Sequence, residues 1–84
     1  NVAIYPTGSI VQLNTNELAI VVRVYPRLQT RPVVRILTTS DGEYIGSPVE
    51  IDLTQKLTTF VVKQLTEQEI IALDQQIRRS QNHH

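Results

Sequence analysis

Alternating apolar and polar residues divide the chain into a long β-rich region and a short helical tail. The expected strands are Ile10 to Leu13, Leu18 to Tyr25, Val33 to Leu37, Tyr44 to Ile45, Val49 to Leu53 and Phe60 to Leu65. No helical pattern lies between these five or six short strands. We therefore expect a mainly β fold, a small antiparallel barrel, and not a parallel sheet.

Residues that favour turns separate the expected strands. Tyr5-Pro6-Thr7-Gly8 is typical of a turn that leads into the first strand, because Pro fixes φ and Gly accepts a positive φ. Asn14 or Asn16 can hold the next hairpin, since Asn tolerates the left-handed region. Asp41-Gly42 is a strong hairpin signal, and Pro32 fits only the start of a strand.

The period of two also predicts which side chains of the second strand are buried. If Arg23 points to water, the core face carries Leu18, Ile20, Val22 and Val24.

The tail begins with a capping box, in which the side chains of Thr66 and Glu69 bind each other's backbone N–H groups. We expect a helix from Thr66, with Ile70, Leu73 and Ile77 on one apolar face. Something must cover this face. Either the helix folds back on the barrel, which we favour, or it pairs with a second copy to form a homodimer.

This pattern divides the chain into a barrel module at residues 1–65, an amphipathic helix at 66–80 and a polar tail at 81–84. We expect His83 and His84 to be the remnant of an affinity tag. The chain has no Met and begins at Asn1, so we expect an excised domain of a longer protein.

Composition limits the class of protein. A chain of 84 residues forms one domain, and 40% hydrophobic with 19% charged residues is too apolar for a disordered tail. No apolar run is long enough to span a membrane. Without cysteine there is no disulfide framework, so we expect a soluble, cytoplasmic domain that does not bind membranes.

The residue types also argue against an enzyme. The chain has two histidines, both at its C-terminal end, and it has no cysteine. Metal clusters that hydrolyse phosphodiesters need several His and Asp ligands in one pocket. We therefore expect no catalytic residue, no metal site and no cofactor.

Charge is informative through its distribution, because eight basic and eight acidic residues cancel. The basic residues Arg23, Arg27, Arg31 and Arg35 follow one another with no acid between them, and Tyr25 lies among them. This arginine band, with Tyr25, is a candidate surface for a phosphate, a nucleotide or an acidic partner. Alternatively, these arginines pair across the sheet with acids on the neighbouring strands, which we favour.

Four segments together resemble a known bacterial extension. Tyr5-Pro6-Thr7-Gly8-Ser9 runs into the first strand, Glu17 to Val24 forms the second, Arg31-Pro32-Val33-Val34 opens the third, and Ile51-Asp52-Leu53 follows. Their order and spacing are similar to the C-terminal extension of bacterial HD-GYP proteins. The Asn at position 16 and the helix after Leu65 depart from many relatives.

The resemblance implies a fold and a role. The fold is a partly open, antiparallel SH3-like barrel of five or six strands with one C-terminal α-helix. HD-GYP domains resemble metal-dependent phosphohydrolases, and characterised members hydrolyse cyclic di-GMP at a metal cluster whose ligands would lie upstream of Asn1. The resemblance implies a noncatalytic docking or scaffolding module, whose partner is the upstream HD-GYP domain or another signalling protein. We do not expect nucleic acid as a partner.

Overall fold

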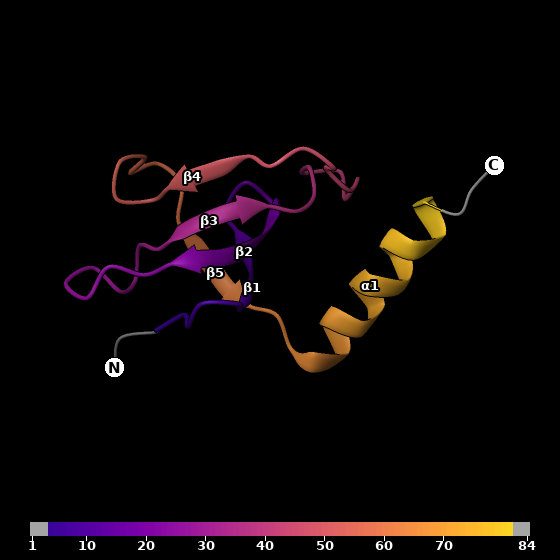
Figure 1. Ribbon diagram of the computed structural model, residues 1–84, viewed down its shortest axis with the longest axis horizontal. Coiled ribbons are helices and arrows are strands. Elements are labelled where there is room, and N and C mark those ends of the chain that lie inside the picture. The colour runs from indigo at the N-terminus through magenta and orange to yellow at the C-terminus, as the bar shows by residue number, and fades with distance from the viewer. Residues whose placement is uncertain (1–3, 82–84) are drawn as a thin grey trace.

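The computed structural model describes residues 4–81, so the expectation for His83 and His84 lies outside the described residues. Five strands and one helix follow in order (Figure 1): β1 Ile10–Leu13, β2 Leu18–Arg23, β3 Val33–Ile36, β4 Glu50–Asp52, β5 Val61–Gln64 and α1 Glu67–Gln81. Each strand lies within its expected range. The expected strand at Tyr44 is reduced to a single antiparallel bridge from Tyr44 to Thr38.

The five strands form one antiparallel sheet in the order β4-β3-β2-β1-β5. Its two edge strands, β4 and β5, do not pair with each other, so the sheet stays open. The expectation of a mainly β, partly open antiparallel fold with one C-terminal helix is confirmed.

Three turns confirm the local signals. Gly8 has a φ of 94° and Gly42 a φ of 87°, as the turns at Pro6 to Ser9 and Thr39 to Gly42 require. Asn16, and not Asn14, takes the left-handed conformation in the β1–β2 hairpin, with a φ of 72°.

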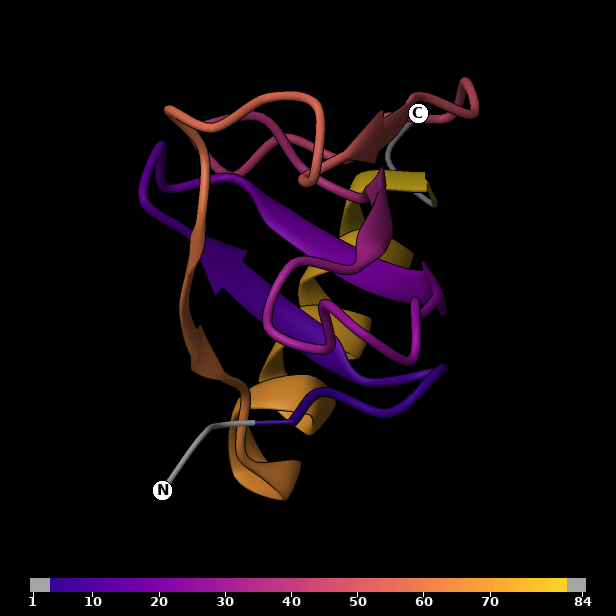
Figure 2. The same cartoon turned by 90° about the vertical axis from the view of Figure 1, so that its left-hand side faces the viewer.

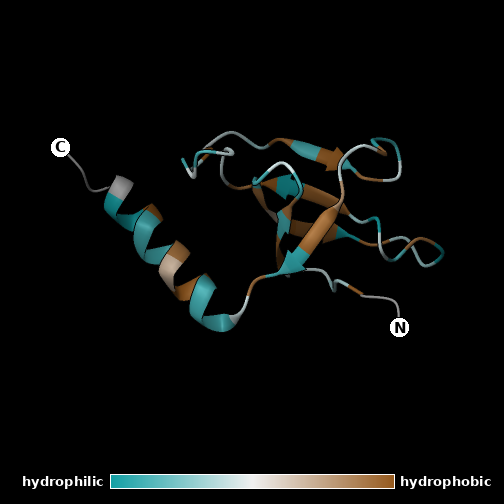
Figure 3. Ribbon diagram, turned by 180° about the vertical axis from the view of Figure 1, so that it is seen from behind, coloured by the Kyte–Doolittle hydropathy of each residue, from teal (hydrophilic) through white to brown (hydrophobic). Residues whose placement is uncertain are grey.

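The core lies on one face of the sheet. Its buried members are Val11, Leu13, Ala19, Val21, Val34, Ile36 and Leu53, with Tyr5, Val24, Ile45, Ile51 and Val61 packed partly against them. Figure 3 shows apolar residues along the strands and also on parts of α1. Each strand of the sheet's interior therefore contributes to one continuous core.

The prediction that Leu18, Ile20 and Val22 lie on the core face is wrong. Ala19 and Val21 are buried instead, while the three predicted residues are half-buried on the opposite face. Register explains the difference. Ala19 is the cross-strand partner of Val11, and such partners lie on the same side of a sheet.

A β-bulge in β2 explains why Arg23 nevertheless points to water. Val21 pairs with Val34 and Arg23 pairs with Val33, so two steps along β2 match one step along β3. The extra residue shifts the alternation by one. Beyond the bulge, Val24 therefore packs against the core and Arg23 is exposed.

Helix α1 follows β5 at once and lies along one side of the sheet, behind β1 and β2 in Figure 2. The capping box is formed: Thr66 N donates to Glu69 Oε1 at 2.9 Å, and Glu69 N donates to Thr66 Oγ1 at 3.2 Å. Thr66 is the cap, so the first helical residue is Glu67.

The helix folds back on the outer face of the β1–β2 hairpin. Leu73 is buried and lines one hollow with Leu18 and Leu65, while Ile70 and Ile77 are half-buried. Gln76 Nε2 also donates to the Gly42 carbonyl at 2.9 Å. This arrangement covers part of the apolar face that the sequence left open.

The opposite end of the barrel carries the start of the described chain, the β2–β3 connection and the β4–β5 connection, and it faces the viewer in Figure 2. Arg31 joins the two connections by donating to the carbonyls of Leu53 at 2.9 Å and Thr59 at 3.1 Å. Leu28 and Leu57 are exposed on these connections, at 50% and 66%. We call this region the loop end.

Candidate functional site

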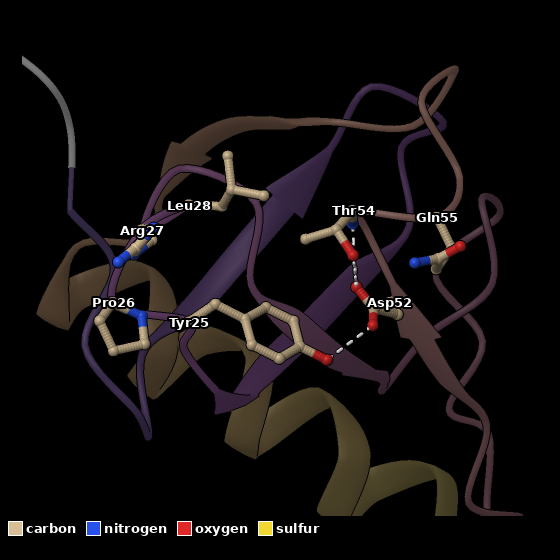
Figure 4. Close-up of a pocket in the computed structure, with 7 residues that line it drawn as sticks. All are labelled: Tyr25, Pro26, Arg27, Leu28, Asp52, Thr54 and Gln55. Carbon is tan, nitrogen blue, oxygen red and sulfur yellow. Dashed lines mark hydrogen bonds between the residues drawn. The ribbon is translucent and has the colours of Figure 1, made fainter.

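A cleft of about 580 Å³ opens at the loop end, between the start of the β2–β3 connection and the end of β4. Tyr25, Pro26, Arg27 and Leu28 form one side, and Asp52, Thr54 and Gln55 form the other (Figure 4). Its volume falls within the range of about 300 to 1,000 Å³ that is common for ligand pockets. We call it the Tyr25 cleft.

One hydrogen bond joins the two sides of the Tyr25 cleft, and two more fix the Asp52 carboxylate within its own side. The Tyr25 hydroxyl donates to Asp52 Oδ2 at 2.7 Å, and the Thr54 hydroxyl donates to Asp52 Oδ1 at 2.6 Å. Thr54 N also donates to Oδ1, at 2.9 Å, in the tight turn that ends β4. Asp52 thus anchors both the aromatic ring and its own turn.

These bonds shift the acidities of both groups. Hydrogen bonds from Thr54 and then from Tyr25 hold the pKa of Asp52 below its usual value. The hydrogen bond to Asp52, followed by desolvation, raises the pKa of Tyr25. The tyrosine therefore stays a neutral donor and the aspartate an ionised acceptor across the neutral range.

Two arginines of the expected arginine band lie at this cleft. The Arg23 guanidinium lies over the Tyr25 ring, 5.8 Å from its centroid, which is within cation–π range. Arg27 lines the cleft and is exposed. Neither guanidinium makes an ion pair with an acid among residues 4–81.

The other two arginines of the band are engaged elsewhere. Arg31 clamps the β4–β5 connection through backbone carbonyls. Arg35 forms an ion pair with Glu50, its cross-strand partner, at 3.3 Å. The four arginines therefore do not form one free basic surface, and one of them makes the cross-strand pair expected for the favoured alternative.

Sequence reasoning missed the acidic side of the cleft. The sequence singles out Asp52 only as part of the segment Ile51-Asp52-Leu53, and it indicates no role for Thr54 or Gln55. The spacing Asp52-x-Thr54 is a local signal for a side-chain turn, since Asp commonly accepts from the N–H two residues on. Nothing in the sequence indicated that Tyr25 would reach this turn.

Within residues 4–81, no three His, Cys, Asp or Glu side chains gather as metal ligands. No helix in that range is long and apolar enough to cross a membrane.

Comparison with known proteins gives one result. The family described as "KOW domain associated with HD domain" matches residues 10–73, from β1 into α1. The match includes the start of the helix, which the sequence suggested was a departure from the family. No curated protein and no solved structure matches the chain.

KOW domains are SH3-like barrels, which agrees with the open five-stranded sheet and confirms the expected fold. The matched range covers well over half of the chain and all five strands. The resemblance to a C-terminal extension of HD-domain proteins is therefore supported by the family itself. The chain belongs to the family of KOW domains associated with HD domains.

Proposed function

We propose that this chain is the noncatalytic C-terminal accessory module of a bacterial HD-GYP-type cyclic di-GMP phosphodiesterase, or of a degenerate relative, and that it docks on the HD domain of the same protein. The observation that carries the proposal is the family match, because that family is defined by its association with an HD domain. The HD domain supplies the metal site and the chemistry.

The proposed docking surface is the loop end. Leu28 and Leu57 are exposed there, and the Tyr25 cleft lies beside Leu28. A single exposed leucine is common on any protein surface, but an apolar cleft lined by Leu28, with Leu57 exposed at the same end of the barrel, supports an interaction site. The described chain also starts at this end, which would bring an HD domain that precedes it close to the loop end.

The side chains of the cleft support a binding role and not catalysis. Nucleophilic catalysis needs a Ser, Thr, Cys or Lys next to a free base. Thr54 is next to Asp52, but both oxygens of that carboxylate already accept hydrogen bonds that hold the turn and the ring. The hydrogen bonds of Asp52 with Tyr25 and Thr54 thus hold the cleft in shape.

The alternative function, a phosphate or nucleotide module based on the arginine band, has less support. Two of its four guanidiniums are engaged by carbonyls and by Glu50. The two that remain are Arg23 and Arg27, and the Asp52 carboxylate accepts a hydrogen bond from the hydroxyl of Tyr25, over whose ring Arg23 lies.

The test is a titration of the isotope-labelled chain with the HD domain of the same protein, followed by NMR. We expect chemical shift changes confined to the loop end. Leu28→Ser should weaken binding, whereas Ile71→Ser, a matched change of a half-exposed residue on α1, should not. A footprint on α1, or equal loss in both variants, would refute docking through the loop end.

A second measurement tests the noncatalytic part of the proposal. The isolated chain is incubated with cyclic di-GMP and Mn²⁺ or Fe²⁺, and the products are separated by chromatography. We expect no hydrolysis above the rate of metal alone. Turnover by the isolated chain would contradict the proposal.

A further inference from the structure

We propose that the Tyr25 cleft binds an extended peptide segment in which an apolar side chain is flanked by a carboxylate. The apolar side chain enters the cleft against Tyr25 and Leu28, and the carboxylate meets Arg27 at its rim. This inference rests on the proposed function, since the HD domain is the expected source of the segment.

The walls of the cleft fit an apolar side chain. The Tyr25 ring, the Pro26 ring and the half-exposed Leu28 side chain offer apolar surface on one side, and the methyl group of Thr54 faces them from the other (Figure 4). Covering this surface removes it from water, which is the main source of favourable free energy in most peptide docking. Gln55 at the far side offers an amide to a peptide backbone.

The charges of the cleft select an acidic neighbour for that side chain. Arg27 makes no ion pair among the described residues, whereas Arg23 already acts on the charge of Asp52, and the Asp52 carboxylate accepts three hydrogen bonds. The cleft therefore has one exposed lining cation, Arg27, that no acid among the described residues pairs with, and one anion whose oxygens are occupied. A carboxylate in the ligand completes this arrangement, because charge-assisted hydrogen bonds to guanidinium are among the strongest in proteins.

The cleft is also held open before any ligand arrives. The hydrogen bond from Tyr25 to Asp52 joins residues that are 27 apart in the sequence, and Thr54 fixes the carboxylate from the other side. A ligand thus need not order these side chains, so less conformational entropy is lost on binding.

A peptide fits this cleft better than a nucleic acid. Binding of single strands needs a basic groove that follows several phosphates and several aromatic side chains on which bases stack. Here only Tyr25 offers a ring, with Arg23 already over it, and the Asp52 carboxylate lies 2.7 Å from the ring's hydroxyl.

The experiment is an NMR titration of the isotope-labelled 84-residue chain with short blocked peptides. The first peptide carries leucine and proline flanked by glutamates, the second has lysines in place of the glutamates, and the third has serines in place of the leucines. We expect saturable shifts at the amides of Tyr25, Leu28, Thr54 and Gln55 with the first peptide, and weak or no binding with the other two.

Two matched variants test the contribution of charge. Arg27→Ala and Arg79→Ala each remove one exposed arginine, the second of them on α1 and away from the cleft. Arg27→Ala should weaken binding of the acidic peptide by roughly tenfold, the typical value of one charge-assisted hydrogen bond. Arg79→Ala should leave it within about twofold, as screening reduces distant charges. Tyr25→Phe keeps the ring and should weaken binding less than Arg27→Ala.

The outcomes separate this inference from the proposed function. Equal binding of the glutamate and lysine peptides, or equal effects of Arg27→Ala and Arg79→Ala, would refute it. Displacement of the peptide by a short single-stranded RNA that binds more tightly would also refute it, in favour of nucleic acid. If the HD domain binds the loop end but does not compete with the peptide, the docking function stands and the inference about the cleft fails. If the peptide binds but the HD domain does not, the inference about the cleft stands and the docking function fails.

Discussion

The attachment of α1 to the sheet depends on Leu73, so replacing this residue by Ala should undo it. Leu73 keeps only 6% of its surface exposed, although it lies at the periphery of the core. Replacement of a buried Leu by Ala costs about 2 to 5 kcal/mol. We expect about 2 kcal/mol for Leu73→Ala, since a peripheral site can close partly around the smaller side chain.

Such a loss is large for a domain of this size. The total free energy of unfolding of a small domain is about 5 to 15 kcal/mol, and each kcal/mol shifts Tm by about 4 to 8 °C. Leu73→Ala should therefore lower Tm by roughly 8 to 16 °C. Because an isolated helix of 15 residues is marginal in water, detachment should also reduce helical signal before the sheet unfolds.

Circular dichroism during thermal and urea unfolding measures this effect, and Ile71→Ala is the control. Ile71 is 46% exposed on the same helix, and Ala has the better helix propensity, so this variant should lose less than about 1 kcal/mol. Equal destabilisation by the two variants would refute the docking of α1 through Leu73.

Light scattering tests the alternative in which the apolar face of α1 joins two copies. Under folding back, the full chain and a chain cut after Leu65 should have the same number of copies per particle, and the cut chain should be less stable. A dimer of the full chain beside a stable monomer of the cut chain would contradict the arrangement described above.

Two further predictions concern charged side chains. The hydrogen bond from Lys63, followed by the backbone N–H of Thr66, lowers the pKa of the Glu69 carboxyl from 4.5 to about 2. Because this pKa is lower in the folded chain, the ionised Glu69 stabilises the fold above about pH 4.5, and this stabilisation is lost as the pH falls toward 2. Glu69→Gln should therefore remove this pH dependence from the urea unfolding midpoints measured over that range. An unchanged pH dependence in the variant would contradict the prediction. Arg31→Ala should destabilise the chain by about 2 kcal/mol, because it releases the β4–β5 connection. Arg35→Ala, which breaks an exposed ion pair, should cost less than about 1 kcal/mol in the same urea assay. The opposite ranking of the two variants would contradict the role of Arg31 in holding this connection.

The sequence by itself determined the features that depend on neighbours along the chain. The turn at Asn16 and the capping box of Thr66 and Glu69 close within a few residues, so residue type and spacing suffice to predict them. The hairpin signal of Asp41-Gly42 is of the same kind. The number of strands and the mainly β class follow from these local signals together.

Only the tertiary structure decided which face of β2 is buried and where the cleft lies. Both faces of β2 are apolar, because one faces the core and the other faces α1 and its surroundings, so the period of two could not distinguish Ala19 from Leu18. The choice follows from the register with β1 and from the bulge before Arg23. The Tyr25 cleft likewise depends on the pairing of β3 with β4, which brings Asp52 within hydrogen-bond distance of a ring 27 residues earlier in the chain. Strand pairing is a property of the folded sheet, and no local pattern in the sequence encodes that distance.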